Sequence, residues 1–415
     1  MTTDRLRVAL FSSEYPPHVV GGLGVHVESL TASLADRVSF DLFAPAEGDY
    51  RLANPAVRVH EIPAANVRTD VEHWLCHCQA AARLAEPIAR EADLLHCHDW
   101  MTVLAGVRLR QVTGKPLVYN VHLPQNTGLR TALENLGLLG ADLVLVNSRA
   151  VREELMARGL PVRRFEVVPN GIDLDTFKPG EDWPRDRGYV LFVGRLVAQK
   201  GVDLLLRAFG ALLQRCPESR LVVVGDGELE LYLNRLTRFL GFPDRVSFAG
   251  WRTGADLVEL YQDAQVVVIP SFYEPFGIVA LEAMACGRPV IASRVGGLQE
   301  IVTDGVEGCL FEVGDYLGLA SRLARLILDP ELSARMGAAA RRRAAAFSWS
   351  GVAGDTLRLY RELAGQPVEP LPAELAAGFR DELLSGVGGT VGRAIEELLA
   401  GVEPPVAAHT QEEHP

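Results

Sequence analysis

Short apolar runs alternate along the chain with longer stretches in which apolar residues recur at helical spacing. Runs such as VALF at 8–11 and LVYNV at 117–121 are typical of strands that are buried on both faces. Further strands are expected at 40–44, 57–62, 94–96 and 143–146, and a long helix at 71–91. This alternation predicts an α/β fold with a doubly wound, mostly parallel sheet.

The same pattern starts again in the second half of the chain. Residues 176–187 are rich in proline and charge and are predicted to link two domains. After them, YVLFVGR predicts a strand, 202–216 an amphipathic helix and 229–240 another helix, with strands in SRLVVVG and RVSFAGW. Two doubly wound units are therefore expected, an N-terminal one over 1–178 and a second over 188–347, facing each other across a cleft.

One stretch, residues 266–293, combines a strand, a loop, a helix over 276–286 and a second strand over 289–293. Glu274 lies in the loop and Glu282 lies in the helix. The free N–H groups at the helix N-terminus suit a phosphate or a sugar oxygen. The rise of about 1.5 Å per residue places Glu282 well inside the helix. The two acids are therefore not predicted to flank one bond, as the carboxyl pair of a glycosidase does.

Polar residues follow several strands of the first half. Gly21 and Gly22 lie between the first strand and the next helix, where backbone N–H groups could approach a diphosphate, although a plain strand–helix turn would also use glycines. The other polar residues at strand ends are Glu14, His98, Asp99 and His122. A metal site built from the HCHDW segment with Cys76 and Cys78 is disfavoured, because residues two apart on a helix face different ways.

In the second half, Arg195 and Lys200 follow the strand that ends at Gly194. Two cations there would neutralise a diphosphate and stabilise its charge as it leaves. Both could instead be solvated surface residues. Cations near a helix N-terminus oppose the helix dipole, however, so an anion between them is the favoured interpretation.

Charge and composition narrow the class of protein. The net charge is −12, and residues 366–415 hold nine acidic residues against two arginines. Such a balance argues against nucleic-acid binding and strong binding to anionic membranes. No run of 18 apolar residues and no secretory segment is present, and the six cysteines are scattered. A cytoplasmic protein with reduced thiols is therefore expected.

These motifs, taken in order, resemble the retaining glycosyltransferases of family 4. Members have the GT-B fold of two Rossmann-like domains, and the chain is similar to bacterial glycogen synthases and their small-acceptor relatives. The similarity covers about residues 5–365 and rests on EYPPHVVGGLGVHV, HCHDW, His122, PNGID, GRLVAQKG, VGDGE and EPFGIVALE. In the family the last helix, here 348–365, crosses back to complete the first domain. The acidic tail 366–415 lies outside the similarity.

The resemblance implies a hexosyl transfer, by front-face substitution, from a UDP-, ADP- or GDP-linked sugar to a hydroxyl of a small acceptor. A glucosyl group is the expected sugar, with no other cofactor, no metal ion and no nucleic acid. The oligomeric state stays open. The implied catalytic residues are His122, Arg195, Lys200 and Glu274; the implied donor-binding residues are Gly21, Gly22, Phe276, Gly277, Ile278, Glu282, Gly250 and Trp251; the implied acceptor-side residues are Glu14, His98 and Asp99.

The chain departs from the family pattern in two places. Glycogen synthases carry a lysine two places before the glycine pair, where this chain has Val19. The segment 122–148 is also short, which favours a small acceptor over a polymer. The acids Glu14, Asp99 and Glu134 would suit a cationic acceptor such as an aminocyclitol. The alternatives are a glucan synthase, a GT-B nucleotide-sugar epimerase or phosphorylase, and a sugar-nucleotide-binding protein without catalysis.

Overall fold

The computed structural model describes residues 5–17, 21–46, 54, 56–63, 70–180 and 188–369. It divides the chain into two compact units. Unit 1 holds the described residues up to Val146, Arg152–Val168 and those from Ala353 onward, and unit 2 holds Asn147–Val151 and Pro169–Val352. Val19, residues 181–187 of the predicted linker and the tail from 370 lie outside the described residues.

Unit 1 is built on a seven-stranded sheet with the order β3-β2-β1-β4-β5-β6-β7, in which all neighbouring strands are parallel. The strands are β1 (Leu6–Phe11), β2 (Val38–Pro45), β3 (Val57–Ile62), β4 (Leu94–His98), β5 (Leu117–Val121), β6 (Leu143–Val146) and β7 (Phe165–Val167). The predicted strands are confirmed. The pattern missed β7, a three-residue strand that is only half-buried and so lacks a clear apolar run.

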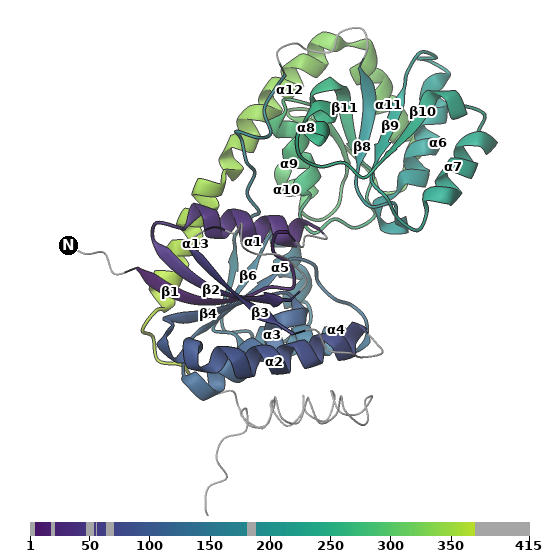
Figure 1. Ribbon diagram of the computed structural model, residues 1–415. Helices are drawn as coiled ribbons and strands as arrows, with labels where there is room; N and C mark the ends of the chain where they lie inside the picture. Colours follow the sequence, from purple (N-terminus) through teal and green to yellow (C-terminus); the bar gives the residue numbers. More distant parts are fainter. Residues whose placement is uncertain are drawn as a thin grey trace, which may run out of the picture. The chain divides into compact units, whose positions relative to one another are not determined.

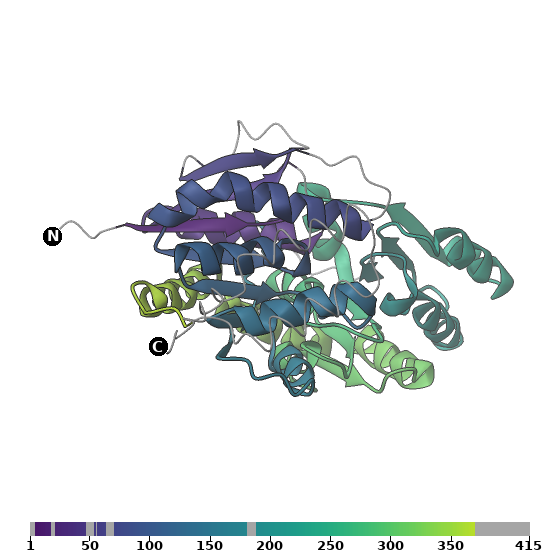
Figure 2. The same cartoon turned by 90° about the horizontal axis from the view of Figure 1, so that it is seen from below.

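Helices cover both faces of this sheet. They are α1 (Gly22–Ser33), α2 (Asp70–Glu91), α3 (Trp100–Thr113), α4 (Gly128–Gly140), α5 (Arg149–Met156) and α13 (Trp349–Leu363). Helices α1 and α13 lie on one face, and α2, α3 and α4 lie on the other (Figure 1). Figure 2 shows the helices of the second group lying across the near side of the sheet.

Unit 2 repeats this design with a six-stranded parallel sheet of order β10-β9-β8-β11-β12-β13. Its strands are β8 (Tyr189–Val193), β9 (Leu221–Val224), β10 (Val246–Gly250), β11 (Ala264–Ile269), β12 (Val290–Ser293) and β13 (Gly308–Phe311). One core cluster packs α6 (Val202–Leu213), α7 (Glu230–Phe239) and α11 (Tyr316–Leu328) against the sheet. The other contains residues of α8 (Gly254–Asp263), α9 (Ile278–Ala285), α10 (Leu298–Ile301) and α12 (Pro330–Ala344). The prediction of two Rossmann-like units is confirmed.

The units exchange segments at points that the sequence did not indicate. The prediction ended the first domain at 178, but residues from Pro169 belong to unit 2, where Ile172 N–H donates to Phe347 O at 2.8 Å. Within α13, the first residues up to Val352 belong to unit 2 and those from Ala353 to unit 1. An apolar pattern shows that a segment is buried but not which of two cores receives it.

The helix predicted at 276–286 begins later, at Ile278. Gly277 has a φ of 105°, and a Cβ there would lie 2.6 Å from Leu298 Cδ2. The backbone therefore turns at Gly277 in a conformation that favours glycine, and regular helix starts only after it. The two residues lost from the helix join the loop that holds Glu274.

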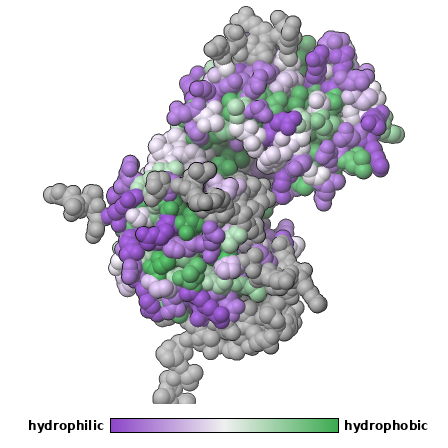
Figure 3. All heavy atoms as spheres, viewed as in Figure 1, coloured by the Kyte–Doolittle hydropathy of each residue, from purple (hydrophilic) through white to green (hydrophobic). Residues whose placement is uncertain are grey.

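The surface drawn in Figure 3 is largely hydrophilic, with apolar residues in small groups. Single large apolar side chains are exposed, such as Phe239 at 86%. Among the helices that the structure describes, none has the length and apolar character needed to span a membrane.

Candidate functional site

Each sheet has a point at which the strand order reverses direction. In unit 1 this point lies between the neighbours β1 and β4, and in unit 2 it lies between β8 and β11. Loops that leave the carboxyl ends of two such strands run to opposite faces and open a crevice, which is the usual ligand site of this architecture. Glu14 and His98 lie at this point in unit 1, and Arg195, Lys200 and Glu274 lie at it in unit 2.

The structure brings together two of the predicted residues of unit 2. Lys200 Nζ donates to Glu274 Oε2 at 2.7 Å, and Ser271 Oγ donates to the same oxygen at 3.1 Å. The two charged side chains are 20% and 12% exposed. A partly buried ion pair of this kind leaves one carboxylate oxygen and two ammonium hydrogens for a ligand.

The loop after β8 is held against the loop after β11 by a close backbone contact. Gly201 follows the short 3₁₀ helix Ala198–Lys200 and has a φ of 64°, and a Cβ there would lie 2.2 Å from Pro270 O. Phe272 N–H also donates to Gln199 O at 2.9 Å. Only glycine fits at position 201, and this contact sets Lys200 beside Glu274.

Arg195 is exposed, and its side chain makes no hydrogen bond or ion pair within the described part of the chain. It is the second cation at the end of β8. The Lys200 side chain is thus held in position by its contact with Glu274, whereas the Arg195 side chain stays available to an anion.

The N-terminus of α9 supplies backbone groups at the end of β11. The Phe276 side chain is 5% exposed and packs edge-on against Phe347, so it belongs to the core. Phe276 can therefore act at the site only through its backbone. The first amides of a helix have no partner within the helix.

Tyr261 is a residue that the sequence analysis missed. It is completely buried on α8, and its hydroxyl donates to Glu282 Oε2 at 2.6 Å. Burial raises the pKa of Glu282 to about 7, and the Tyr261 hydrogen bond acts against that rise. The helical spacing of Leu257 and Tyr261 could have indicated that Tyr261 is buried, but no sequence signal names its partner.

Gly250 and Trp251 lie at the carboxyl end of β10, the edge strand of the sheet. Gly250 O accepts the Gly225 N–H at 2.9 Å, and the Trp251 side chain is 51% exposed. These residues share the ligand end of the sheet with Lys200, two strands away from β8.

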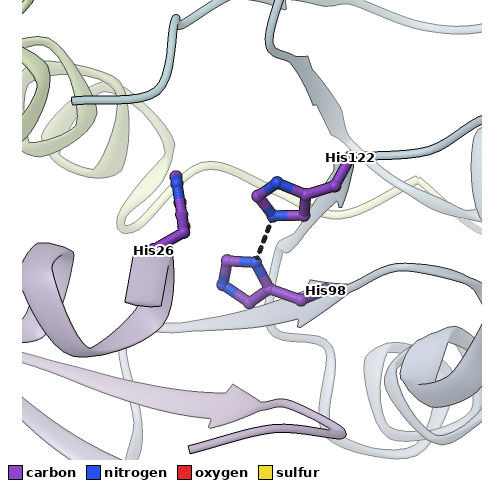
Figure 4. A group of neighbouring side chains, drawn as sticks. All are labelled: His26, His98 and His122. Atoms are coloured by element: carbon purple, nitrogen blue, oxygen red, sulfur yellow. Dashed lines mark hydrogen bonds between the residues drawn. The ribbon is translucent and has the colours of Figure 1, made fainter. Parts of the chain in front are cut away.

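In unit 1, His98 at the end of β4 and His122 just after β5 meet directly (Figure 4). His98 Nδ1 lies 3.0 Å from His122 Nε2, and Asn120 Nδ2 lies 2.6 Å from the same nitrogen. The His122 backbone N–H donates to Asp99 Oδ1 at 2.7 Å. Asp99 has a φ of 55°, an uncommon conformation for a residue with a Cβ, and this turn aims its carboxylate at the loop after β5.

A third histidine, His26 on α1, completes the cluster and was not predicted. It is 4% exposed, with its ring centre 4.5 Å from that of His122 and 5.5 Å from that of His98. Its position three residues after Leu23 and four before Leu30 is that of the buried face of α1. That spacing was the signal that could have found it.

Burial disfavours the charged form of His98 and His122. It lowers the pKa of both His98 and His122 well below the ordinary value, and neighbouring imidazoles lower it further. Next to them, His96 Nδ1 lies 2.6 Å from the Tyr360 hydroxyl, and burial lowers the pKa of His96 to about 3. Burial also raises the pKa of Asp99 to about 7.

The acids that the sequence assigned to the acceptor side all accept hydrogen bonds from the protein. Glu14 Oε2 accepts the Gly21 N–H at 2.9 Å and the Gly24 N–H at 3.3 Å, at the N-terminus of α1. Glu134 is completely buried and pairs with Arg158 at 2.6 Å. With Asp99 bound to the His122 amide, the structure gives no support to an acidic surface that attracts a cationic acceptor.

Comparison with known proteins agrees with this architecture. Residues 20–176 match the family model described as Glycosyltransferase Family 4, and residues 173–343 match the model described as Glycosyl transferases group 1. An uncharacterized glycosyltransferase of Methanocaldococcus jannaschii is 32% identical over 86% of this chain and 98% of its own length.

Two further proteins are similar over most of their length. A D-inositol 3-phosphate glycosyltransferase of Corynebacterium jeikeium is 34% identical over 89% of this chain and all of its own. The structure of a sucrose-phosphate synthase from Thermosynechococcus elongatus aligns with a TM-score of 0.77 at 28% identity, over 86% of this chain and 99% of that one. The chain therefore belongs to glycosyltransferase family 4, whose GT-B enzymes transfer a sugar from a nucleotide-sugar donor to an acceptor.

Proposed function

We propose that this enzyme is a retaining hexosyltransferase. It moves a glucosyl group from a nucleoside diphosphate to a hydroxyl of a small, phosphorylated acceptor by front-face substitution, without a metal ion. The single observation that carries the proposal is the 2.7 Å contact between Lys200 and Glu274 at the reversal point of the unit 2 sheet. It joins a cation suited to a diphosphate with a carboxylate suited to sugar hydroxyls.

The leaving group is stabilised by charge. Lys200, shared between Glu274 and the donor, and the exposed Arg195 neutralise the diphosphate as its bond to the sugar breaks. A diphosphate oxygen takes the proton of the acceptor hydroxyl as the new bond forms on the same face. These two cations do the work that a divalent metal would do, so no metal ion is required.

The uncharged state of His122 suits this reaction. The anomeric carbon gains positive charge as the leaving group departs, and a neighbouring imidazolium would oppose that charge. Burial and the neighbouring imidazoles keep the pKa of His122 low, so at neutral pH the ring exchanges hydrogen bonds with sugar hydroxyls without bringing a charge.

The glycines at the start of α1 also support a ligand role. A Cβ at Gly21 or Gly22 would meet nothing within 4 Å among the described residues. Packing therefore does not require glycine there, whereas the approach of a donor phosphate would. In the structure the Gly21 N–H donates to Glu14, so the donor would share or replace that carboxylate.

The acceptor is proposed from two features. The names of the inositol phosphate enzyme and the sucrose-phosphate synthase both refer to small phosphorylated polyhydroxy compounds, a cyclitol phosphate and a sugar phosphate. In this chain Arg130, in the first turn of α4, lies 5.2 Å from the Trp100 ring centre, next to Asp99. It is a cation within reach of the acceptor-side residues. The short segment between His122 and α4 favours a small acceptor.

The six cysteines are all free thiols, mostly buried, which fits a reducing compartment. We therefore place the enzyme in the cytoplasm, where nucleotide sugars are made.

The test is a donor and acceptor assay on the purified full chain. Thermal stabilisation is measured first with UDP-, ADP- and GDP-glucose, since a ligand that binds only the folded state raises the melting temperature. The stabilising donor is then incubated with inositol phosphate and hexose phosphate acceptors, and the anomeric configuration of the product is read by NMR. An α-linked product is expected from an α-linked donor. An inverted product would refute retention, and release of free nucleotide without a glycoside would indicate an epimerase or hydrolase.

A further inference from the structure

We propose that His26, His98 and His122 form a zinc-binding site in unit 1, with one ring nitrogen from each as a ligand. The three side chains come from three separate elements, α1, the end of β4 and the residue after β5. No part of the proposed transfer reaction uses a metal ion there. The binding itself does not depend on the proposed function.

The geometry is close to that of a three-histidine zinc centre. One nitrogen of each ring lies within 4.8 Å of the other two. Tetrahedral Zn²⁺ with Zn–N distances of about 2.1 Å places its ligand nitrogens about 3.4 Å apart. Side-chain rotations that move each nitrogen by about 1 Å would close the site around an ion. A water molecule or a substrate oxygen would take the fourth position.

One nitrogen of the cluster lacks a partner. His98 is completely buried, and its Nε2 has no hydrogen-bond partner among the described residues, whereas its Nδ1 faces His122 Nε2. A buried polar atom without a partner is costly, and native structures usually satisfy it. A metal ion bonded to this nitrogen would do so.

The ligand set also selects the ion. Three imidazole ligands without a carboxylate favour zinc, copper, nickel and cobalt over magnesium, calcium and manganese. Asn120 Nδ2 lies 2.6 Å from His122 Nε2, and a zinc ion bonded to that nitrogen would take the place of this contact.

A functional consequence follows if the proposed function is right. The proposed function puts His122 beside the donor sugar. A zinc ion bonded to His122 would occupy the place of that sugar. Zinc would then inhibit transfer reversibly, and a chelator would restore it. The site would make this enzyme sensitive to free zinc while its chemistry needs no metal.

The experiment measures zinc binding on the full chain after chelator treatment and dialysis. Zn²⁺ is titrated in competition with a chromogenic zinc indicator, and one strongly bound ion per chain is expected. His26→Gln should weaken binding by at least the factor of about 10–100 that loss of an outer contact costs. His77→Gln is the matched control, because the buried His77 and the half-buried His73 form another imidazole pair, on α2, with ring centres 6.5 Å apart. Circular dichroism checks that both variants fold.

A second measurement does not require a variant. Co²⁺ in place of Zn²⁺ should give the intense visible absorption of a four-coordinate site. No tight binding, binding abolished by His77→Gln but not by His26→Gln, or the weak spectrum of octahedral Co²⁺ would each overturn the proposal. If zinc binds as predicted but no transfer activity is found with any donor, the proposed function fails and the zinc site stands. If an active enzyme keeps its full rate with zinc bound, the predicted inhibition is wrong.

Discussion

The two units present the same strand arrangement with opposite chemistry. At the reversal point of unit 1, the side chains that meet are buried, uncharged imidazoles, His98 and His122, with His26 against them. At the reversal point of unit 2, they are a partly exposed ion pair, Lys200 and Glu274, with the exposed Arg195 nearby. The backbone thus provides two equivalent reversals of strand order, and the loop residues decide what can bind at each.

The difference has a physical reason. The negative charge of a diphosphate must be matched by cations. Burying a cation away from water has a large desolvation cost, so these cations lie where water still reaches them. Sugar and acceptor hydroxyls are neutral, and buried neutral groups can bind them without a large desolvation cost. The ion pair of unit 2 is thus suited to the diphosphate, and the buried histidines of unit 1 are suited to neutral hydroxyls.

The largest expected effect is on the ion pair of unit 2. Lys200→Ala removes a charge that stabilises the departing diphosphate, so kcat should fall by about 10²-fold or more. The measurement is steady-state transfer with the donor that the stabilisation assay selects. Lys178→Ala, which removes an exposed lysine, is the control and should keep the wild-type rate. Near-normal turnover of a folded Lys200→Ala variant would contradict the diphosphate role.

A smaller effect, on the KM for the donor, is expected from changing the buried Tyr261 of α8. Tyr261→Phe leaves Glu282 without the 2.6 Å hydrogen bond and raises its pKa further above about 7. Because an ionised Glu282 is the better acceptor for ribose hydroxyls, the KM for the donor should rise about tenfold at pH 7, with kcat nearly unchanged.

The rise in KM should shrink as the pH is raised above 7, because Glu282 then becomes ionised in both proteins. This pH dependence separates a positioning role from general damage to the fold. A loss confined to kcat, or a change in KM that is the same at every pH, would contradict the assigned role of Tyr261.

The third effect is on stability, and it has opposite signs in the two units. The pKa of His96 in unit 1 falls from 6.5 to about 3 on burial, so its contribution is present above pH 6.5 and is lost as the pH falls toward 3. The pKa of Glu282 in unit 2 rises from 4.5 to about 7, so its contribution is present below pH 4.5 and is lost as the pH rises toward 7.

Urea unfolding at pH 5 and pH 7 tests this. His96→Asn should reduce the loss of unfolding free energy on going from pH 7 to pH 5, and Glu282→Gln should reduce the opposing change. Native-state hydrogen exchange assigns each change to its unit. Equal pH slopes in the wild type and His96→Asn would show that His96 titrates normally in the folded protein.

The smallest expected effect is that of removing divalent metals. If the cations of unit 2 replace a metal ion at the diphosphate, treatment with EDTA should not lower the rate of transfer. The assay compares chelator-treated enzyme with and without added Mg²⁺ or Mn²⁺. Full loss of turnover that Mg²⁺ or Mn²⁺ restores would contradict the proposal that Arg195 and Lys200 replace a metal ion at the diphosphate.

Much of the fold followed from local pattern. The strands over 117–121 and 143–146 begin and end where the sequence pattern predicted, because strands covered on both faces are mostly apolar along their length. The repetition of that pattern in the second half indicated the second unit. The residues after strand ends, such as Lys200 and His122, could be placed near ligand sites because parallel strands all end at one edge.

Contacts between distant segments could not be predicted in this way. The sequence by itself determined the two Rossmann-like units and which polar residues stand at the ligand ends of their strands, since both depend on spacing along the chain. Only the tertiary structure decided that Tyr261 supports Glu282, that His26 joins His98 and His122, and that Glu134 is held by Arg158. These partners lie up to 96 residues apart, as between His26 and His122. Folding alone brings them within bonding distance, because a pattern along the chain shows which side chains are buried but not what they are buried against.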